Sequence, residues 1–96
     1  MAIGVIATLT VQDGKNEEFE AVFATLAEQV LANEAGAIFY SLHRSKSDGN
    51  VYKVLEQYSD QAALDAHGQT DYFKAAGLKL GACLAAKPDV EVLDAV

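Results

Sequence analysis

Residues 55–73 read LEQYSDQAALDAHGQTDYF, and this stretch decides how the rest of the chain is interpreted. Alternating residues predict a strand that ends at Tyr58, and the chain then turns into a short helix over residues 60–67. Gly68 predicts the end of that helix, and Thr70 predicts the N-cap of the next one. The stretch contains a carboxylate, two tyrosines, a phenylalanine and one of the two histidines. Groups that can move a proton therefore lie beside aromatic surface.

The remaining elements follow from apolar periodicity. Strands are predicted at 3–11, 37–46, 51–58 and 90–96, and helices are predicted to start at 15, 60 and 70. The first helix stops within residues 33–36, and Lys87-Pro88 breaks the last one. Asp48-Gly49 predicts a hairpin between the second and third strands. A tight turn would pair residue 39 with 58, 41 with 56 and 43 with 54, whereas a bulge would shift this register.

The element order is β-α-β-β-α-β, with the short helix before the second long one, which is the ferredoxin-like α+β arrangement. It places the helices on one face of a four-stranded antiparallel sheet and leaves the other face bare. We expect one domain over residues 1–96. The strands carry apolar residues on both faces, for example Phe39 beside Tyr40. We therefore expect a homodimer in which two sheets pack face to face.

Composition excludes several classes of protein. The net charge of −7 comes from 14 acidic and 7 scattered basic residues, which predicts no nucleic-acid partner and no polybasic membrane surface. We find no signal peptide and no apolar run long enough to span a bilayer. Cys83 is the only cysteine. It fits a reducing compartment, so a cytoplasmic location is expected, and we read its side chain as a small buried hydrophobe. Metal-ligand spacings, nucleotide-binding loops and a nucleophile elbow are all missing, which predicts no metal and no bound cofactor.

The chain resembles the antibiotic biosynthesis monooxygenase family of dimeric α+β barrels, which includes quinol monooxygenases. The resemblance extends over nearly the whole chain. It is carried by Gly14-Lys15 before a helix with Phe19, Phe23 and Leu26, and by Gly36 shortly before Tyr40. Its most specific part is residues 56–67, EQYSDQAALDAH, which is similar to the family's E-x-W/Y run ending in histidine. Thr70 and Phe73 continue it. The family hosts several chemistries on this scaffold.

One branch of the superfamily degrades haem, and the resemblance argues against that activity here. Members of that branch carry a haem-ligating histidine on the long helix, where this chain aligns Gly77. They also place a tryptophan at the end of the short helix, where this chain has His67 and where no tryptophan exists anywhere in the sequence. We therefore expect no haem ligand at this site.

Eight residues are candidate site residues. The predicted catalytic residues are His67, Glu56 and Tyr58, and the predicted substrate-binding residues are Tyr40, Tyr72, Phe73, Phe39 and Phe23. His67 is the first candidate because an imidazole can act as a general base toward a phenol or an enol. The simpler interpretation is that His67 only lies at the C-terminus of a helix, where its side chain interacts favourably with the helix dipole. Glu56 could orient His67, bind substrate, or form an ion pair with Arg44 or Lys53. The aromatic residues could hold a planar substrate or could be core.

Three functions remain open from the sequence. The resemblance implies a cofactor-independent monooxygenase that oxidises a quinol or polyphenol with O₂ and uses His67 as general base. The second hypothesis is an isomerase of a small keto-enol or sugar-like metabolite, in which His67 and Glu56 move a proton. The third is a dimer that binds a small hydrophobic ligand without turnover.

Overall fold

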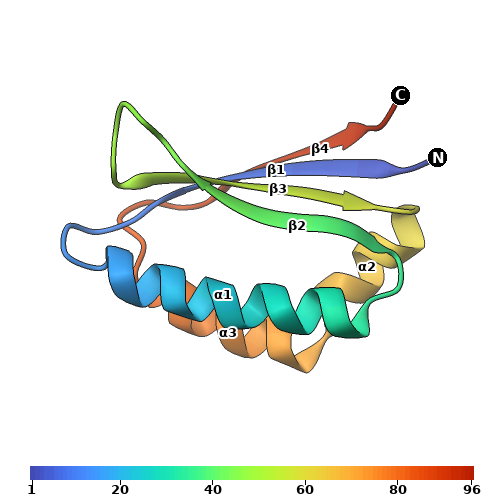
Figure 1. Cartoon of the computed structure of the whole chain (residues 1–96), viewed down its shortest axis with the longest axis horizontal. Helices are drawn as coiled ribbons and strands as arrows, with labels where there is room; N and C mark the ends of the chain where they lie inside the picture. Colours follow the sequence, from blue (N-terminus) through green and yellow to red (C-terminus); the bar gives the residue numbers. More distant parts are fainter.

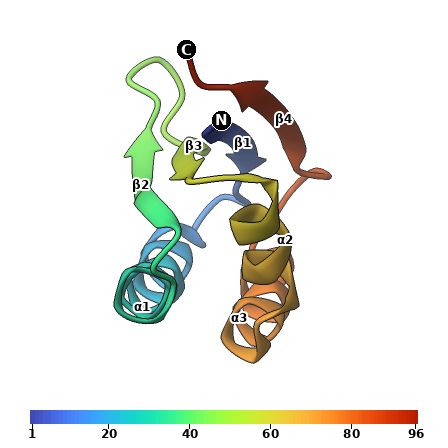
Figure 2. The same ribbon diagram turned by 90° about the vertical axis from the view of Figure 1, so that its right-hand side faces the viewer.

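We describe the protein from a computed structural model that covers all 96 residues. The elements in chain order are β1 (Ile3–Thr10), α1 (Asn16–Asn33), β2 (Ala37–Arg44), β3 (Val51–Tyr58), α2 (Gln61–Gln69), α3 (Asp71–Ala82) and β4 (Asp89–Asp94). The four strands form one antiparallel sheet in the order β2-β3-β1-β4. The three helices lie together on one face of this sheet (Figure 1). Seen along the strands, α1 lies on the β2 side, and α2 and α3 lie on the other side (Figure 2). The predicted ferredoxin-like α+β fold is confirmed.

Alternation in β1 and β3 gives the sheet its two faces. In β1 the odd-numbered residues are buried beneath the helices, from Ile3 to Leu9. In β3 the even-numbered residues are buried, from Tyr52 to Tyr58. The two sets are paired across the strands, as in Val5 opposite Glu56. The candidate residues of β3 therefore point toward the helices.

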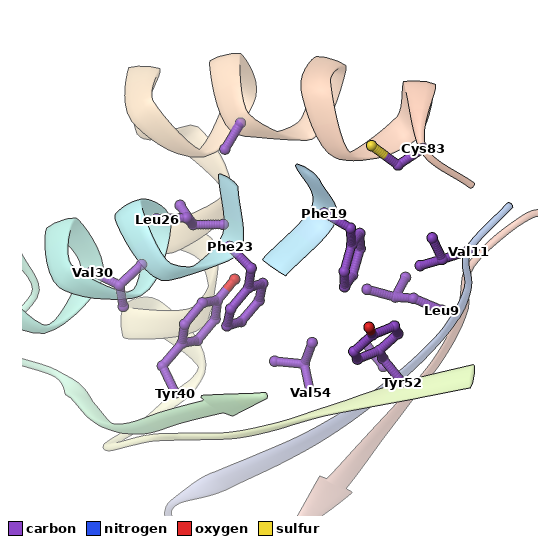
Figure 3. Packing of buried hydrophobic residues seen from close by; sticks show 12 residues of the cluster. Leu9, Val11, Phe19, Phe23, Leu26, Val30, Tyr40, Tyr52, Val54 and Cys83 are labelled. Atoms are coloured by element: carbon purple, nitrogen blue, oxygen red, sulfur yellow. The ribbon is translucent and has the colours of Figure 1, made fainter. Parts of the chain in front are cut away.

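The core fills the space between the sheet and the helices. Phe19, which is fully buried on α1, packs against the ring of Tyr52 at a centroid distance of 4.8 Å. Phe23, one turn further along α1, stacks on Tyr40 at 5.3 Å. Figure 3 shows these two aromatic pairs at opposite ends of the cluster, with Val54 between them. Cys83 is fully buried near the Phe19 end, as the sequence indicates.

The predicted register of the β2–β3 hairpin is wrong by one residue. Tyr40, and not Ser41, lies opposite Glu56, and a bulge interrupts the pairing between Ala37 and Phe39. The connection is not a tight Asp-Gly turn. Ser45 Oγ accepts hydrogen bonds from the backbone N–H groups of Ser47 and Asp48, which curls the chain immediately after β2 ends at Arg44. As a result, Tyr40 points toward the helices and Phe39 points away from them.

Several element boundaries also differ from the predictions, and β1 and β2 end at Thr10 and Arg44, one and two residues early. Helix α2 continues through Gly68 to Gln69, because Thr70 and not Gly68 ends it. The Thr70 hydroxyl donates to the carbonyl of His67 and accepts the N–H of Phe73, so one residue caps both α2 and α3. Helix α3 ends at Ala82, well before Lys87-Pro88, because the following segment pairs with the end of β1 through Val11 and Leu84. Strand β4, Asp89–Asp94, starts one residue earlier and ends two residues earlier than the predicted strand 90–96.

Gly36 allows the turn after α1 to touch the start of α2. Its carbonyl accepts a hydrogen bond from the N–H of Ser59 at 2.8 Å. A Cβ atom at this position would lie 2.6 Å from the Cβ of Ala63 and 3.1 Å from Ser59 Oγ. Contacts this short force the backbone or α2 to move. The glycine is therefore required by close packing.

We expect Gly36→Ala to destabilise the protein by about 1–3 kcal/mol, the usual cost of overpacking. The measurement is the free energy of unfolding from urea titrations. Gly77→Ala is the matched control, because a Cβ at Gly77, inside α3, meets nothing within 4 Å. That control should stabilise the protein by about 0.5–1 kcal/mol through helix propensity. Equal effects of the two substitutions would contradict the close-packing role of Gly36.

Candidate active site

A cavity of about 730 Å³ lies between the sheet and the helices. It is lined by 21 residues, of which 14 are hydrophobic. The sheet contributes Val5, Ala7, Leu9, Tyr40, Val54, Glu56 and Val90, and the helices contribute Phe23, Leu26, Leu64, His67, Gly68, Phe73, Gly77, Leu80 and Gly81. The segment between α3 and β4 completes the wall. Its size and mostly apolar lining suit a small organic molecule with few polar groups.

His67 reaches this cavity from the last turns of α2. The helix begins at Asp60, whose side chain accepts the N–H of Ala63 at 2.9 Å and caps the first turn. It ends where the Thr70 hydroxyl holds the carbonyl of His67. Both ends are therefore fixed by side chains. The imidazole is only 4% exposed and lies among the rings of Tyr40, Tyr58 and Phe73, with centroid distances of 5.2, 5.3 and 4.5 Å.

The two nitrogens of His67 have different surroundings. Nδ1 lies 3.0 and 3.1 Å from the two carboxylate oxygens of Glu34. Nε2 has no hydrogen-bond partner in the protein. Every side-chain nitrogen or oxygen that is fully shielded from solvent has a hydrogen-bond partner. Nε2 has none, so it is not fully shielded. Nε2 therefore opens onto the cavity that the ring lines.

Glu34 was not among the candidates from the sequence. It follows the last residue of α1, and its carboxylate also accepts a hydrogen bond from the hydroxyl of Tyr72 on α3. A negative charge at a helix C-terminus is unfavourable with the helix dipole, so an acidic residue there needs a partner. That signal was present in the sequence. The partner, His67, is 33 residues away and could not be read from local pattern.

Glu56 bonds to Tyr58 and not to His67 or a cation. The Tyr58 hydroxyl donates to Glu56 Oε1 at 2.6 Å. The two cations considered as ion-pair partners are engaged elsewhere, Arg44 with Glu20 and Lys53 with Thr8. Burial raises the pKa of Glu56, and the Tyr58 hydrogen bond opposes that rise. Glu56 thus keeps its proton to a higher pH than an exposed glutamate.

Only some of the predicted site residues line the cavity. His67, Glu56, Tyr40, Phe73 and Phe23 line the cavity together. Tyr58 is fully buried behind them, where it touches Glu56 and His67 but not the cavity. Tyr72 bonds to Glu34 on the far side of the imidazole. Phe39 lies on the outer face, 43% exposed, because the hairpin pairs it with the outward-facing Gln57, next to Tyr40 opposite Glu56.

All four tyrosines have a raised pKa, in each case chiefly because burial disfavours the phenolate. Tyr72, whose hydroxyl also bonds to Glu34, has its pKa raised to about 12. Unfolded tyrosines ionise near pH 10. Above that pH the unfolded state loses protons that the folded state retains, so stability falls as pH rises from about 10 toward the folded pKa. We expect the urea midpoint to drop as the pH rises from about 10 to about 12, with tyrosinate absorbance appearing only on unfolding. Tyrosinate in the folded state near pH 10 would contradict this.

Comparison with known proteins identifies the family. Residues 2–77 match the profile of the family described as "Antibiotic biosynthesis monooxygenase". This match includes β1, α1, the β2–β3 hairpin, α2 and the part of α3 up to Gly77. Both His67 and Glu34 therefore lie within it. The chain belongs to the antibiotic biosynthesis monooxygenase family. A protein of Caulobacter crescentus CB15 that is named after this family is 56% identical and has a similar structure, with a TM-score of 0.97 over 99% of this chain and 90% of that one.

Two other relatives of this family member extend the comparison. A conserved protein from Methanosarcina mazei Go1 is 29% identical and superposes with a TM-score of 0.93 over 97% of this chain and 91% of that one. An uncharacterized protein of Synechocystis sp. is 37% identical over 71 residues, which are 74% of this chain. The chain spans about half, 48%, of that relative's length.

The structure contains no group of three or more His, Cys, Asp or Glu side chains placed to hold a metal ion. None of its helices combines the length and the apolar character that crossing a membrane requires.

Proposed function

We propose that this chain is a monooxygenase that oxidises a small electron-rich aromatic, a quinol or polyphenol, with O₂ and without a bound cofactor. The observation that carries the proposal is the state of His67. One nitrogen is held by a carboxylate, and the other opens onto a mostly apolar cavity. That arrangement suits a general base acting on a phenol bound among aromatic rings. Membership of the family agrees with it.

The reaction begins with the proton of the phenol, which passes to Nε2 of His67. The phenolate is a better reductant than the phenol, so it gives one electron to O₂ and leaves a phenoxyl radical and superoxide. These recombine into a carbon-bound peroxide. The imidazolium returns its proton to the outer peroxide oxygen, which gives a hydroperoxide. The imidazole then takes the hydrogen on that carbon as a proton, the electron pair of the broken C–H bond forms the quinone C=O, and the O–O bond breaks. The departing hydroxide accepts that proton from His67 and leaves as water. The protein's contribution is proton removal, orientation and the exclusion of bulk water.

Other polar groups in the cavity have supporting roles in this proposal. Tyr40 lines the cavity with its ring stacked on Phe23, and burial raises its pKa further from neutrality. Its hydroxyl therefore serves as a hydrogen-bond donor to substrate and not as a base. Glu56 lines the same cavity and can form a hydrogen bond with a substrate hydroxyl group. Tyr58 holds Glu56 in place from behind.

The bare face of the sheet supports assembly as a homodimer. Apolar side chains are exposed on both edge strands of the sheet, Ile38 at 53% and Phe39 at 43% on β2 and Leu93 at 39% on β4. Exposed apolar patches of this kind mark association surfaces. We propose that two sheets pack through this face. A Phe39→Glu variant that sediments as a monomer, beside a dimeric wild type, would support the arrangement, and a monomeric wild type would contradict it. A cytoplasmic location stays a prediction from composition.

The test is oxygen consumption with a panel of quinols and polyphenols, measured with an oxygen electrode on purified protein. Stoichiometric O₂ uptake with quinone formation is expected. Glu56 and His67 line the same cavity, so proton transfer without oxygen is the second candidate. Turnover of a keto-enol substrate under strict anaerobiosis would favour that isomerase. Thermal stabilisation by a ligand with no product in either assay would indicate a binding protein and would overturn the oxygenase proposal.

A further inference from the structure

The carboxylate of Glu34 has two partners that come from different helices. His67 on α2 gives its Nδ1, and Tyr72 on α3 gives its hydroxyl. The Glu34 side chain is 12% exposed and that of His67 is 4% exposed, so the contact is largely shielded from water. Hydrogen bonds to a charged group are stronger when water is excluded. The position of Glu34 is itself fixed, since the turn at Gly36 is bonded to Ser59 at the start of α2.

We propose that Glu34 is a positioning residue for His67 and that Tyr72 holds it in place. This inference rests on the proposed function of His67 as a general base and adds a residue to it. A carboxylate can only accept a hydrogen bond, so Nδ1 must carry a proton and donate it. In the neutral imidazole the lone pair is then on Nε2, which is the nitrogen that opens onto the cavity. Glu34 thereby selects the tautomer that can accept a substrate proton.

Glu34 has a second effect once the proton has moved. Protonated His67 is a cation in a nearly dry site, and an isolated buried cation is costly. Glu34 supplies the opposite charge 3.0 Å away, so the proton on Nε2 is held until it is returned to the departing oxygen. Glu34 keeps its negative charge throughout, and no net proton leaves the site. The negative charge is in turn stabilised by the Tyr72 hydroxyl.

Glu56 is the other carboxylate of the cavity, and it does not meet these requirements. It bonds to Tyr58, it contacts neither nitrogen of His67 through a hydrogen bond, and burial favours its neutral form. Without a hydrogen bond to either nitrogen, Glu56 cannot select the tautomer of the imidazole. The geometry therefore separates the two acids, with Glu34 behind the imidazole and Glu56 in front of it.

The test reads the tautomer of His67 directly by nitrogen-15 NMR. The chain has only two histidines, and His43 is exposed on the outer sheet face, so protein labelled at histidine gives a simple spectrum. A His43→Gln variant assigns the remaining signals to His67. At a pH where both rings are neutral, we expect Nδ1 of His67 to show the shift of a protonated nitrogen and Nε2 the shift of an unprotonated one. The reverse pattern in wild-type protein overturns the proposal, and this measurement requires no change at Glu34.

The variant Glu34→Gln has nearly the same shape and no charge. Its amide can accept from Nδ1 or donate to it, so we expect the tautomer preference of His67 to weaken while His43 is unchanged. With a quinol that wild type oxidises, kcat should fall by about 10- to 100-fold with KM little changed. The reason is that a smaller fraction of His67 has the lone pair on Nε2, where it can accept the substrate proton. Glu28→Gln, an exposed change of equal charge on α1, is the control and should alter neither. An unchanged tautomer in Glu34→Gln overturns the proposal. If wild type oxidises no quinol, the proposed function fails, but the spectra still decide the role of Glu34.

Discussion

Replacing His67 by glutamine will lower kcat for quinol oxidation by about 10²–10⁴-fold, the usual contribution of a general base. Glutamine fills most of the volume of the imidazole and can still accept from the substrate hydroxyl, but it cannot take the proton. Substrate affinity should therefore change less than turnover. The measurement is steady-state oxygen consumption, with binding followed separately by thermal shift.

His43→Gln is the matched control for this prediction. It makes the same chemical change at the only other histidine, which is exposed on β2 and far from the cavity lining. We expect wild-type turnover from it. The ring of His67 also packs against three aromatic rings, so the melting temperature of each variant must be compared. Turnover by His67→Gln at half the wild-type rate or more would remove His67 from the mechanism.

The largest effect on stability is expected from Phe19→Ala. Phe19 is fully buried, and its ring packs against Tyr52 at the end of the core remote from His67. Truncation of a buried phenylalanine costs about 3–5 kcal/mol from lost transfer energy and the cavity left behind. A small domain has only about 5–15 kcal/mol in total, so a substantial fraction of molecules should unfold in mild urea.

Urea titration with far-ultraviolet circular dichroism measures this loss. Leu31→Ala on the same helix is the control, because Leu31 is 54% exposed. It should change the free energy of unfolding by less than about 0.5 kcal/mol. Phe19 does not line the cavity, so Phe19→Ala should retain turnover at temperatures where it is folded. A loss below about 1 kcal/mol would mean that the core collapses around the missing ring.

Local patterns were sufficient to predict the fold. Alternation from Ile3 to Leu9, the three- and four-residue spacing from Phe19 to Val30, and the cap at Thr70 each depend on residues close in the sequence. The order of elements then leaves few arrangements in the ferredoxin-like class. His67 was predicted as a site residue from its place at the end of a short helix and from the family resemblance, and the structure places it on the cavity wall.

The missed features depend on contacts between distant residues. Glu34 meets His67 only after α2 folds against the end of α1, a relation that no periodicity encodes. From the sequence, Glu56 was instead considered as an orienting group for His67, a substrate ligand or an ion-pair partner of Arg44 or Lys53. Phe39 was predicted to bind substrate together with Tyr40, but the hairpin pairs it with Gln57 on the outer face. That register follows from the Ser45 hydrogen bonds in the loop, which an Asp-Gly pair alone does not indicate.

The bulge at Ile38 links the apolar outer face of the sheet to the cavity on its other face. The extra residue leaves Ile38 and Phe39, which are consecutive, both exposed, and it returns Tyr40 to the cavity side of β2. Without this extra residue, strict alternation along β2 would turn Ala37 and the positions before it to the opposite face of the sheet. A one-residue deletion in residues 37–39 would therefore alter the proposed assembly surface and the alignment of the helix-to-strand turn behind Glu34 together. Among homologues, the length of this segment should be far more constrained than the identity of its side chains.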